Sequence, residues 1–415
     1  MRDFRFLHTA DIHLDSPMRG LEADPDAPIK LVREASRAAF RNLIDTAINE
    51  RVAFVLIAGD LYDGDWQDWR TGLFFIEQVS RLAAAGIPLI MVAGNHDAAS
   101  VITRHLRLPE HVTLFPHDRG GRLLLEEYGV AVHGQSFATR AVTEDLSRNY
   151  PDPVPDLFNI GLLHTSLTGR PGHENYAPTT VDVLIAKGYD YWALGHVHAR
   201  EIIHEDPWIV FPGNLQGRQV RESGPKGATL VTVRDRRVAT LDHRILDVFR
   251  WCPIDVSVSG ERNLDDAMDR IGRALSTSLE AAEGRPMAAC VRLTGATSLH
   301  EQFVAEAERL RQAVLAEARQ YGVDTVWIQS VVIDTASMAN LESLRSRPDV
   351  VGRLSKILDE LIKEAGTELL GEYPDRLLHR SPEMEFPAEH PLGKGRTALL
   401  KRARELVLAN LAGEL

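Results

Sequence analysis

Five apolar runs in the first 200 residues each end at side chains that can bind a metal ion, and this feature constrains the fold most. The runs cover residues 4–10, 52–58, 87–93, 158–163 and 191–194. Each is short and lacks a helical period, as expected of a buried strand. The polar residues that follow the runs are Asp11 and His13, Asp60 and Asp63, Asn95 and His96, His164 alone, and finally His196 and His198.

Helix-like stretches at 30–50 and 69–85 separate the first three runs. We therefore expect these strands to be parallel and joined by crossovers, with their polar ends at one edge of a sheet. From 208 to 244 the strands become shorter and are separated by glycine-rich turns, which predicts an antiparallel second sheet. The prediction is an α/β fold with four layers, αββα, in which two sheets are flanked by helices.

The candidate ligands are mixed oxygen and imidazole donors without a thiolate, which favours Mn²⁺, Fe²⁺ or Zn²⁺ and disfavours an all-oxygen calcium site. Seven donors are more than one tetrahedral ion needs, but they suit two ions that share a bridging carboxylate. Two such ions clamp a phosphate and activate a hydroxide that attacks phosphorus, so phosphoester hydrolysis is the expected reaction. The seven are Asp11, His13, Asp60, Asn95, His164, His196 and His198.

Composition limits the remaining possibilities. With 44% hydrophobic and 26% charged residues, the 415-residue chain is typical of a soluble globular protein without a membrane span. Its formal net charge of −12 argues against a general electrostatic nucleic-acid binder, so any DNA contact would use local patches. Only Cys252 and Cys290 are present, and the amino terminus does not resemble a signal peptide, so a reduced, cytoplasmic location is expected. His8 and His133 lie inside apolar runs and are expected to be core or loop histidines.

The motifs themselves carry a family resemblance. DIH, GDLYD, GNHD, an isolated histidine and GHVH, in this order, resemble the calcineurin-like metallophosphoesterase superfamily. HTADIHLDSP, AGDLYD and ALGHVH are similar to SbcD-like DNA repair exonucleases, and NLQGRQVRESGPKG resembles their YhaO-type branch. The likeness is strong over residues 1 to 245 and covers the remainder only in outline.

The resemblance implies a role for each residue of the site. Asp11, His13 and His198 would hold one ion, Asn95, His164 and His196 the other, and Asp60 would bridge them. The two ions are expected to be Mn²⁺. His96 would be the catalytic histidine that binds no metal. Asp63 lies where phosphatases of the superfamily have a carboxylate that orients this histidine, whereas some repair nucleases have a second histidine there.

A glycine-rich loop at 213–226 and the residue after GHVH offer donors for a DNA backbone. Arg200, Asn214 and Arg218 are the expected substrate contacts, because phosphate oxygens accept hydrogen bonds from such groups. From the residues alone, a merely solvated loop is an equally good interpretation. The family resemblance favours DNA contact.

Three regions are expected. Residues 1–246 form the metallophosphoesterase nuclease domain, and 247–336 are expected to form a βαβαβ module that resembles the capping domain of such nucleases. A dimerisation or stability domain is the alternative for this module. Residues 337–415 contain two amphipathic helical patterns that either pack on their own domain or dock to a partner. The resemblance implies an SMC-type ATPase partner, SbcC-like or YhaN-like, and a homodimer.

The predicted function is that of a two-metal-dependent DNA exonuclease, with endonuclease activity as a further expectation, acting in DNA repair. Two other functions share the same motifs. One is a phosphoesterase that acts on a small molecule or a phosphoprotein, because the metal chemistry is common to the superfamily. The other is a scaffold without turnover, which would predict eroded ligands, whereas all seven are present.

Overall fold

The computed structural model describes residues 2–16, 29–63, 69–99, 107–167, 176–322 and 324–337, with a few further positions between 348 and 360. The chain divides into two compact units. Residues 1–252 and 284–288 form the first unit, and residues 253–283 and 289–415 form the second.

The first sheet of the first unit contains the predicted parallel strands. Its strand order is β12-β11-β1-β2-β3-β4, and β1 to β4 all run in the same direction. Helices α1 and α2 connect β1 to β2 and β2 to β3, so the predicted crossovers are confirmed. The bounds are β1 (Phe4–Thr9), α1 (Ile29–Asn49), β2 (Phe54–Ala58), α2 (Trp69–Ala84), β3 (Leu89–Val92), α3 (Asn95–Ala99) and β4 (Val112–Leu114).

The second sheet has the order β5-β6-β7-β8-β10-β9. Strands β6, β7, β8 and β10 are parallel, and the two edge strands pair antiparallel to them. The bounds are β5 (Gly121–Leu125), η1 (Glu126–Tyr128), β6 (Val130–Gly134), η2 (Leu146–Asn149), β7 (Phe158–His164), α4 (Val181–Ala186), β8 (Tyr191–Gly195), β9 (Glu201–Glu205) and β10 (Trp208–Phe211).

The prediction of a separate antiparallel sheet over 208–244 was wrong. Strand β10 lies parallel to β8 in the second sheet. Strands β11 (Gly227–Arg234) and β12 (Arg237–Ile245) form a hairpin that extends the first sheet, where β11 pairs antiparallel with β1. The turn between the strands is a local signal, whereas pairing with β1 joins segments more than 200 residues apart and leaves no local pattern.

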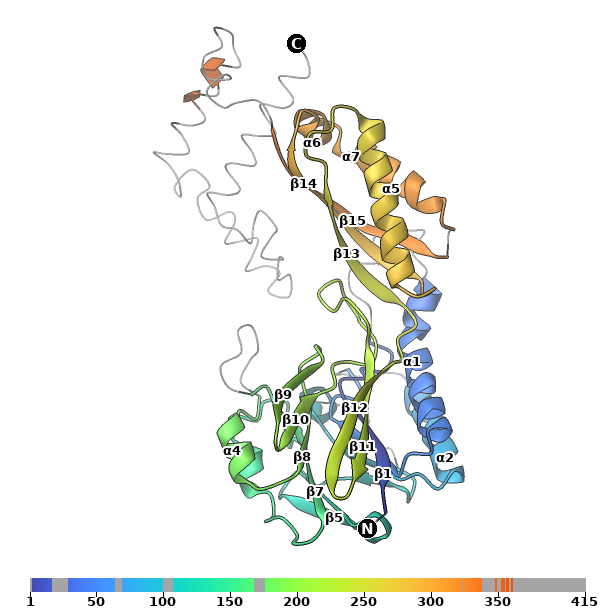
Figure 1. Cartoon of the computed structure of the whole chain (residues 1–415), viewed down its shortest axis with the longest axis vertical. Helices are drawn as coiled ribbons and strands as arrows, with labels where there is room; N and C mark the ends of the chain where they lie inside the picture. Colours follow the sequence, from blue (N-terminus) through green and yellow to red (C-terminus); the bar gives the residue numbers. More distant parts are fainter. Residues whose placement is uncertain are drawn as a thin grey trace. The chain divides into compact units, whose positions relative to one another are not determined.

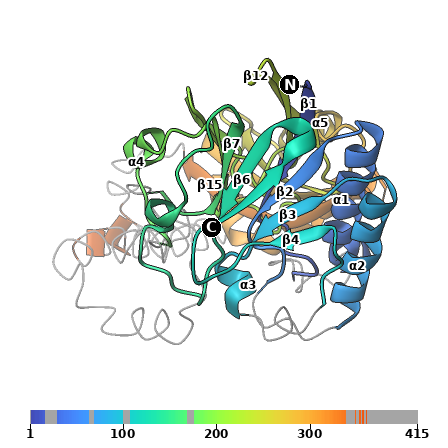
Figure 2. The same ribbon diagram turned by 90° about the horizontal axis from the view of Figure 1, so that it is seen from below.

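The predicted four layers are present. Phe40 of α1 and Phe75 of α2 pack on the outer face of the first sheet, with their ring centroids 5.9 Å apart. Between the sheets, the Phe6 ring contacts the Tyr191 ring edge-on at 5.3 Å. Leu184 of α4 covers the outer face of the second sheet. Figure 2 shows α1 and α2 on one side of the paired sheets and α4 on the other.

The second unit contains the predicted strand and helix order. Its sheet has the order β13-β14-β15, with α5 and α7 beside it (Figure 1). The elements are β13 (Arg250–Ser257), α5 (Leu264–Ala281), β14 (Met287–Thr297), α6 (His300–Ala305), α7 (Ala307–Arg319) and β15 (Val326–Ser337). The second helix of the expected βαβαβ module is two helices in the structure, α6 and α7, because Glu306 (φ −109°, ψ 37°) leaves the helical conformation. His300 Nδ1 lies 2.9 Å from Thr335 Oγ1 of β15, so α6 is fixed to the sheet at its start.

Most of the predicted C-terminal region, 337–415, lies outside the described residues. Among the described helices, none combines the length and the apolar character needed to cross a bilayer. His8 is fully buried and its ring nitrogens contact Tyr191 Oη at 3.0 Å and the Leu194 carbonyl at 3.1 Å. His133 is also buried and contacts Asn159 Oδ1 at 3.1 Å, so the expectation of core histidines is confirmed for both.

Candidate metal centre

The five polar clusters meet at the carboxyl edge of the two sheets, and the backbone is unusual where they do. Asp11 (φ 50°), His13 (φ 46°), Asp60 (φ 54°) and His196 (φ 103°) all have positive φ, which is uncommon for residues other than glycine. Such conformations cluster at functional sites, where the surrounding structure maintains them. These turns direct successive side chains away from the strand axis.

Two glycines make room for the cluster. A Cβ atom on Gly59 would lie 2.4 Å from His164 Nδ1, and Gly59 also has a φ of 91°. A Cβ atom on Gly94 would lie 2.3 Å from Asp60 Oδ1. The glycines of GDLYD and GNHD therefore allow neighbouring strand ends to approach closely.

The donor atoms are spaced as ligands of shared cations. His13 Nε2 and His198 Nε2 lie 3.3 Å apart, and Asn95 Oδ1 lies 2.9 Å from His164 Nε2. Asp60 Oδ2 lies 3.9 Å from His13 Nε2 and 3.5 Å from His164 Nε2. Donors bound to one ion at about 2.1 Å lie roughly 3–3.5 Å from one another. The donor set fits divalent metal ions, and Asp60 lies between its two halves, as a bridging carboxylate would.

Three overlapping groups of donors lie within 4.8 Å of one another among the described residues. Asp11 occurs in two of them, so it faces both halves of the cluster and not only the half to which the resemblance assigns it. His96 also occurs in one group, although the resemblance implies that it binds no metal. The groups are Asp11 with His13 and His198, His13 with Asp60 and His96, and Asp11 with Asp60 and His164.

Hydrogen bonds behind the cluster orient two of the imidazoles. His164 Nδ1 lies 2.9 Å from the Ala58 carbonyl, and His198 Nδ1 lies 2.8 Å from Glu222 Oε1. When Nδ1 donates to such an acceptor, Nε2 carries no proton and presents a lone pair to a metal. Glu222 was missed in the sequence. It lies within NLQGRQVRESGPKG, from which only Asn214 and Arg218 were predicted to be functional, as donors to phosphate.

Burial dominates the electrostatics of the cluster. Burial, followed by the nearby charge of Asp60, raises the pKa of Asp11, and burial also raises the pKa of Asp60. Burial lowers the pKa of His13 and His198 and lowers that of His164 to about 4. Neutral imidazoles are the ligand form, and bound cations would offset the repulsion between the two buried carboxylates.

A second set of contacts surrounds His96. Its Nδ1 lies 2.8 Å from Asp63 Oδ1, and Ser16 Oγ donates to Asp63 Oδ2 at 2.6 Å. Burial opposes the charged imidazole, but the hydrogen bond to Asp63 and the charge of Asp60 outweigh burial and raise the pKa of His96. Arg218 Nη1 lies 3.6 Å from Asp63 Oδ2 and donates to Ser16 Oγ at 3.2 Å.

Asp97 is another residue whose role the sequence did not indicate. It is buried, and its carboxylate accepts backbone N–H groups of Leu61 (3.2 Å), Tyr62 (2.9 Å) and Gly94 (3.1 Å). These donors lie on the loops after β2 and β3, which carry Asp60 and Asn95. Asp97 therefore holds the two loops together.

The three expected substrate contacts lie in different environments. Arg218 lies beside Asp63 at the cluster, and Arg200 is partly exposed. Asn214 is fully buried, and its Nδ2 donates to Glu222 Oε2 at 2.8 Å. This burial contradicts a direct DNA contact for Asn214 and gives it a role in fixing Glu222.

The backbone and the ring of His196 both contact residues of the donor cluster. Its N–H donates to the Asp11 carboxylate at 2.9 and 3.1 Å. Its ring contacts the His164 ring edge-on at 5.2 Å. The role of His196 as a ligand stays a prediction.

Family comparisons agree with this geometry. The calcineurin-like phosphoesterase model matches residues 4–200, which contain all seven candidate ligands. The model for the middle domain of the metallophosphoesterase YhaO matches residues 251–336. The fold, the donor cluster and these matches define the chain as a calcineurin-like metallophosphoesterase, a class of metal-binding phosphoester hydrolases.

Individual relatives narrow the class. The uncharacterized metallophosphoesterase YhaO of Bacillus subtilis is 34% identical over 302 residues, which cover 71% of this chain and 72% of the relative. The chain therefore belongs to the YhaO family. The DNA double-strand break repair protein Mre11 of Sulfurisphaera tokodaii is 28% identical over 249 residues, covering 56% of this chain and 60% of that protein. Mre11 of Sulfolobus acidocaldarius is 27% identical over 290 residues, covering 66% and 70%.

Proposed function

We propose that this metallophosphoesterase is a two-metal-dependent nuclease that hydrolyses phosphodiester bonds in DNA. The observation that carries the proposal is the cluster of carboxylate and imidazole donors with the His96 and Asp63 pair at its edge. The choice of DNA rests on the similarity to relatives named as DNA double-strand break repair proteins and on the SbcD-like motifs. Exonuclease action is the expected mode, with endonuclease action in addition.

Seven residues would hold the two ions, for which Mn²⁺ is our choice because the donors are oxygen and nitrogen. Asp11, His13 and His198 would hold one ion, Asn95, His164 and His196 would hold the other, and Asp60 would contribute to both. When bound, two such cations stabilise charge on a phosphate and make water more acidic. The 3.5 and 3.9 Å distances from Asp60 Oδ2 to the two imidazoles support the bridging role.

His96 acts on the leaving oxygen rather than on a metal. Asp63 accepts the proton of His96 Nδ1 at 2.8 Å, which supports a protonated ring whose Nε2 can donate to the departing oxygen. Ser16 Oγ donates to the other oxygen of Asp63 at 2.6 Å and keeps the carboxylate in place. The presence of His96 in one of the donor groups makes metal binding by His96 the competing role.

Arg218 binds a phosphate oxygen of the substrate. Its guanidinium lies between Asp63 and Glu222, at 3.6 and 3.7 Å, and its side chain remains 19% exposed. The exposed part can therefore donate to DNA, while the two carboxylates fix its direction. Arg200 contacts the sugar–phosphate backbone further along the DNA strand. Asn214 supports the site through its hydrogen bond to Glu222.

The remaining regions would direct the nuclease to its substrate. Residues 247–336 act as a capping domain beside DNA, and 337–415 dock to an SbcC-like or YhaN-like SMC-type ATPase of the cytoplasm. The family resemblance supports this partner and a homodimer. Truncation after Ser337 should abolish co-purification with the ATPase while the metal content stays unchanged. Retention of the ATPase by the truncated chain would refute the docking role.

The decisive test of the proposed activity compares substrates. The purified chain with Mn²⁺ should cleave end-labelled single- or double-stranded DNA and the diester bis-p-nitrophenyl phosphate. Asp60→Asn should abolish both activities. Hydrolysis of p-nitrophenyl phosphate or a phosphopeptide without DNA cleavage would instead indicate a small-molecule or phosphoprotein phosphatase. Absence of turnover on every substrate, with two ions bound, would indicate a scaffold.

A further inference from the structure

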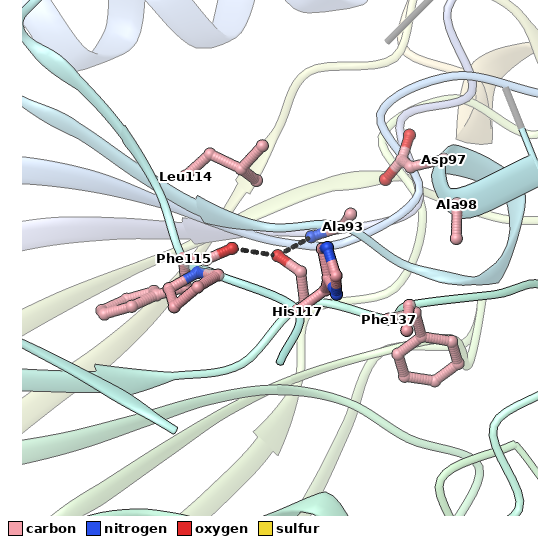
Figure 3. A pocket seen from close by; sticks show the side chains of 10 residues that line it. Ala93, Asp97, Ala98, Leu114, Phe115, His117 and Phe137 are labelled. Atoms are coloured by element: carbon pink, nitrogen blue, oxygen red, sulfur yellow. Dashed lines mark hydrogen bonds between the residues drawn. The ribbon is translucent and has the colours of Figure 1, made fainter. Parts of the chain in front are cut away.

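A cavity of about 530 Å³ lies next to the donor cluster. Figure 3 shows side chains that line it. Its walls come from the segments after β3, β4 and β6. Strand β4 is parallel to β3, and β6 is parallel to β7, so these segments leave their sheets at the edge where the candidate metal ligands lie. Neighbouring strands are about 5 Å apart. The cavity therefore lies about one strand further along this edge than the donor cluster.

The cavity walls are joined directly to candidate metal ligands. Phe137 lines the cavity, and its ring contacts the His164 ring edge-on, with centroids 5.4 Å apart. The Phe137 N–H donates to the Ala93 carbonyl at 2.9 Å, two residues before Asn95. Asp97, on another wall, holds the loops of Asp60 and Asn95 together. A ligand in the cavity would thus be separated from the cluster by a single side chain, such as that of Phe137.

The lining selects a neutral, flat ligand. The Asp97 carboxylate already accepts three backbone N–H groups, and Ser136 Oγ donates to the Phe115 carbonyl at 2.6 Å and accepts the Ala93 N–H at 3.0 Å. The remaining lining is largely apolar and aromatic, with the exposed His117 ring between Phe115 and Phe137 in Figure 3. The carboxylate of Asp97 would repel a phosphate, whereas the exposed imidazole of His117 can stack on a nucleobase.

We propose that this cavity is a subsite for one nucleobase of the DNA strand, next to the phosphate that lies at the donor cluster. The inference rests on the proposed nuclease function and deepens it. The cavity volume is within the range of about 300–1,000 Å³ typical of small-ligand sites and accommodates one nucleoside. Because every base has a stacking face, the subsite holds the strand with little regard to sequence. It accepts a base only when that base is unstacked, so it favours single-stranded or frayed DNA.

A binding experiment locates the base. Single-stranded oligonucleotides that carry 2-aminopurine at successive positions are titrated with the full chain in the presence of a chelator, which prevents cleavage. The fluorescence should change at one position, adjacent to the phosphate that is cleaved once Mn²⁺ is added. His117→Ala should remove this change and His117→Phe should restore it. A uniform change along the strand, or one that His117→Ala leaves intact, would overturn the subsite.

Kinetics provide an independent check with a matched control. Ala138 is an exposed lining residue, so Ala138→Trp fills the cavity with little strain, and Ala239→Trp makes the same change on the exposed side of β12. The ratio of kcat/KM on DNA to that on bis-p-nitrophenyl phosphate should fall about 5-fold or more for Ala138→Trp and His117→Ala, since stacking contributes at least about 1 kcal/mol. Ala239→Trp should leave the ratio unchanged.

The outcomes separate the two proposals. Normal DNA cleavage with unchanged ratios in both cavity variants would refute the subsite while the nuclease function stands. Hydrolysis of bis-p-nitrophenyl phosphate without DNA cleavage by the unmodified chain would refute the nuclease function, and the subsite with it.

Discussion

Replacing Glu222 with glutamine should weaken metal binding although Glu222 is not one of the candidate metal ligands. Glu222 Oε2 accepts the Arg218 N–H at 2.7 Å and Asn214 Nδ2 at 2.8 Å. Two donors fix an oxygen at that position, so the amide nitrogen that Glu222→Gln introduces must occupy the place of Oε1. There it faces His198 Nδ1, which lies 2.8 Å from Oε1 in the native protein.

Both tautomers of the His198 imidazole are then unfavourable. If His198 keeps its Nδ1 proton, two donors face each other across the lost hydrogen bond. If it changes tautomer and accepts from the amide, the proton moves to Nε2, which is the atom that faces His13 and the candidate ion. Either way the lone pair at Nε2 is lost or misaligned. Loss of such an outer partner typically costs 10- to 100-fold in metal affinity, or about 1.4–2.8 kcal/mol.

The assay is equilibrium dialysis against buffered Mn²⁺, with bound metal measured by elemental analysis. The affinity of one ion should fall in E222Q by the stated factor, while the second ion remains bound. Glu50→Gln is the matched control, because Glu50 also accepts from two arginines, Arg5 at 2.6 Å and Arg244 at 2.8 Å, but lies outside the cluster. Native affinity for both ions in E222Q, or an equal loss in the Glu50 variant, would refute the tautomer argument.

Four further outcomes are expected. Exhaustive chelation should abolish hydrolysis and added Mn²⁺ should restore it; activity that survives chelation would contradict the metal centre. His96→Ala should retain two ions by elemental analysis but lose about 10²–10⁴ in single-turnover rate, whereas His196→Ala should also lose an ion, and Asp63→Asn should fall between native and His96→Ala. Asp97→Asn should destabilise the fold by about 1–3 kcal/mol and lower the melting temperature, since an amide cannot accept three N–H groups. Burial lowers the pKa of His8 to about 3, so the folded state excludes the proton that the unfolded chain takes up below pH 6.5. Between pH 6.5 and 5, the free energy of unfolding of the native protein should therefore fall by about 2 kcal/mol more than that of His8→Gln. An equal fall in both proteins, measured by urea denaturation at each pH, would refute this.

The sequence predicts the parts of this molecule that follow from local patterns. Each apolar run forms a strand, and α1 and α2 begin and end within a residue of the expected positions. Parallel strands end at one edge of a sheet, so the strand ends alone indicated that Asp11, Asp60 and Asn95 would meet. The pairing of β11 with β1 was not predictable in this way, because it depends on which edge of the first sheet remains open after the helices have packed.

The roles of the residues that support the ligands were not predicted, for a different reason. A ligand occurs in a recognisable motif, whereas an outer partner is defined only by the atom that it faces after folding. Asp97 is the last residue of GNHD, and the motif alone does not indicate its role. Only the folded structure shows that its carboxylate accepts three backbone N–H groups from two loops. Asn214 has the chemistry of a phosphate contact, but its complete burial is set by the packing of the loop before β11.

Under the proposed function, the loop at 213–226 would link metal binding to substrate binding. Glu222 holds His198 from behind, and four residues earlier in the chain Arg218 reaches Asp63, the partner of His96. The Arg218 backbone N–H also donates to Glu222, so the two side chains are fixed within one turn. A phosphate that draws Arg218 towards itself therefore acts on a loop that also positions a metal ligand. Because β11 follows directly and pairs with β1, the loop is anchored to the strand that ends at Asp11 and His13. The segment whose sequence is typical of the YhaO branch thus contacts both His198 and Asp63, although it contains none of the candidate metal ligands.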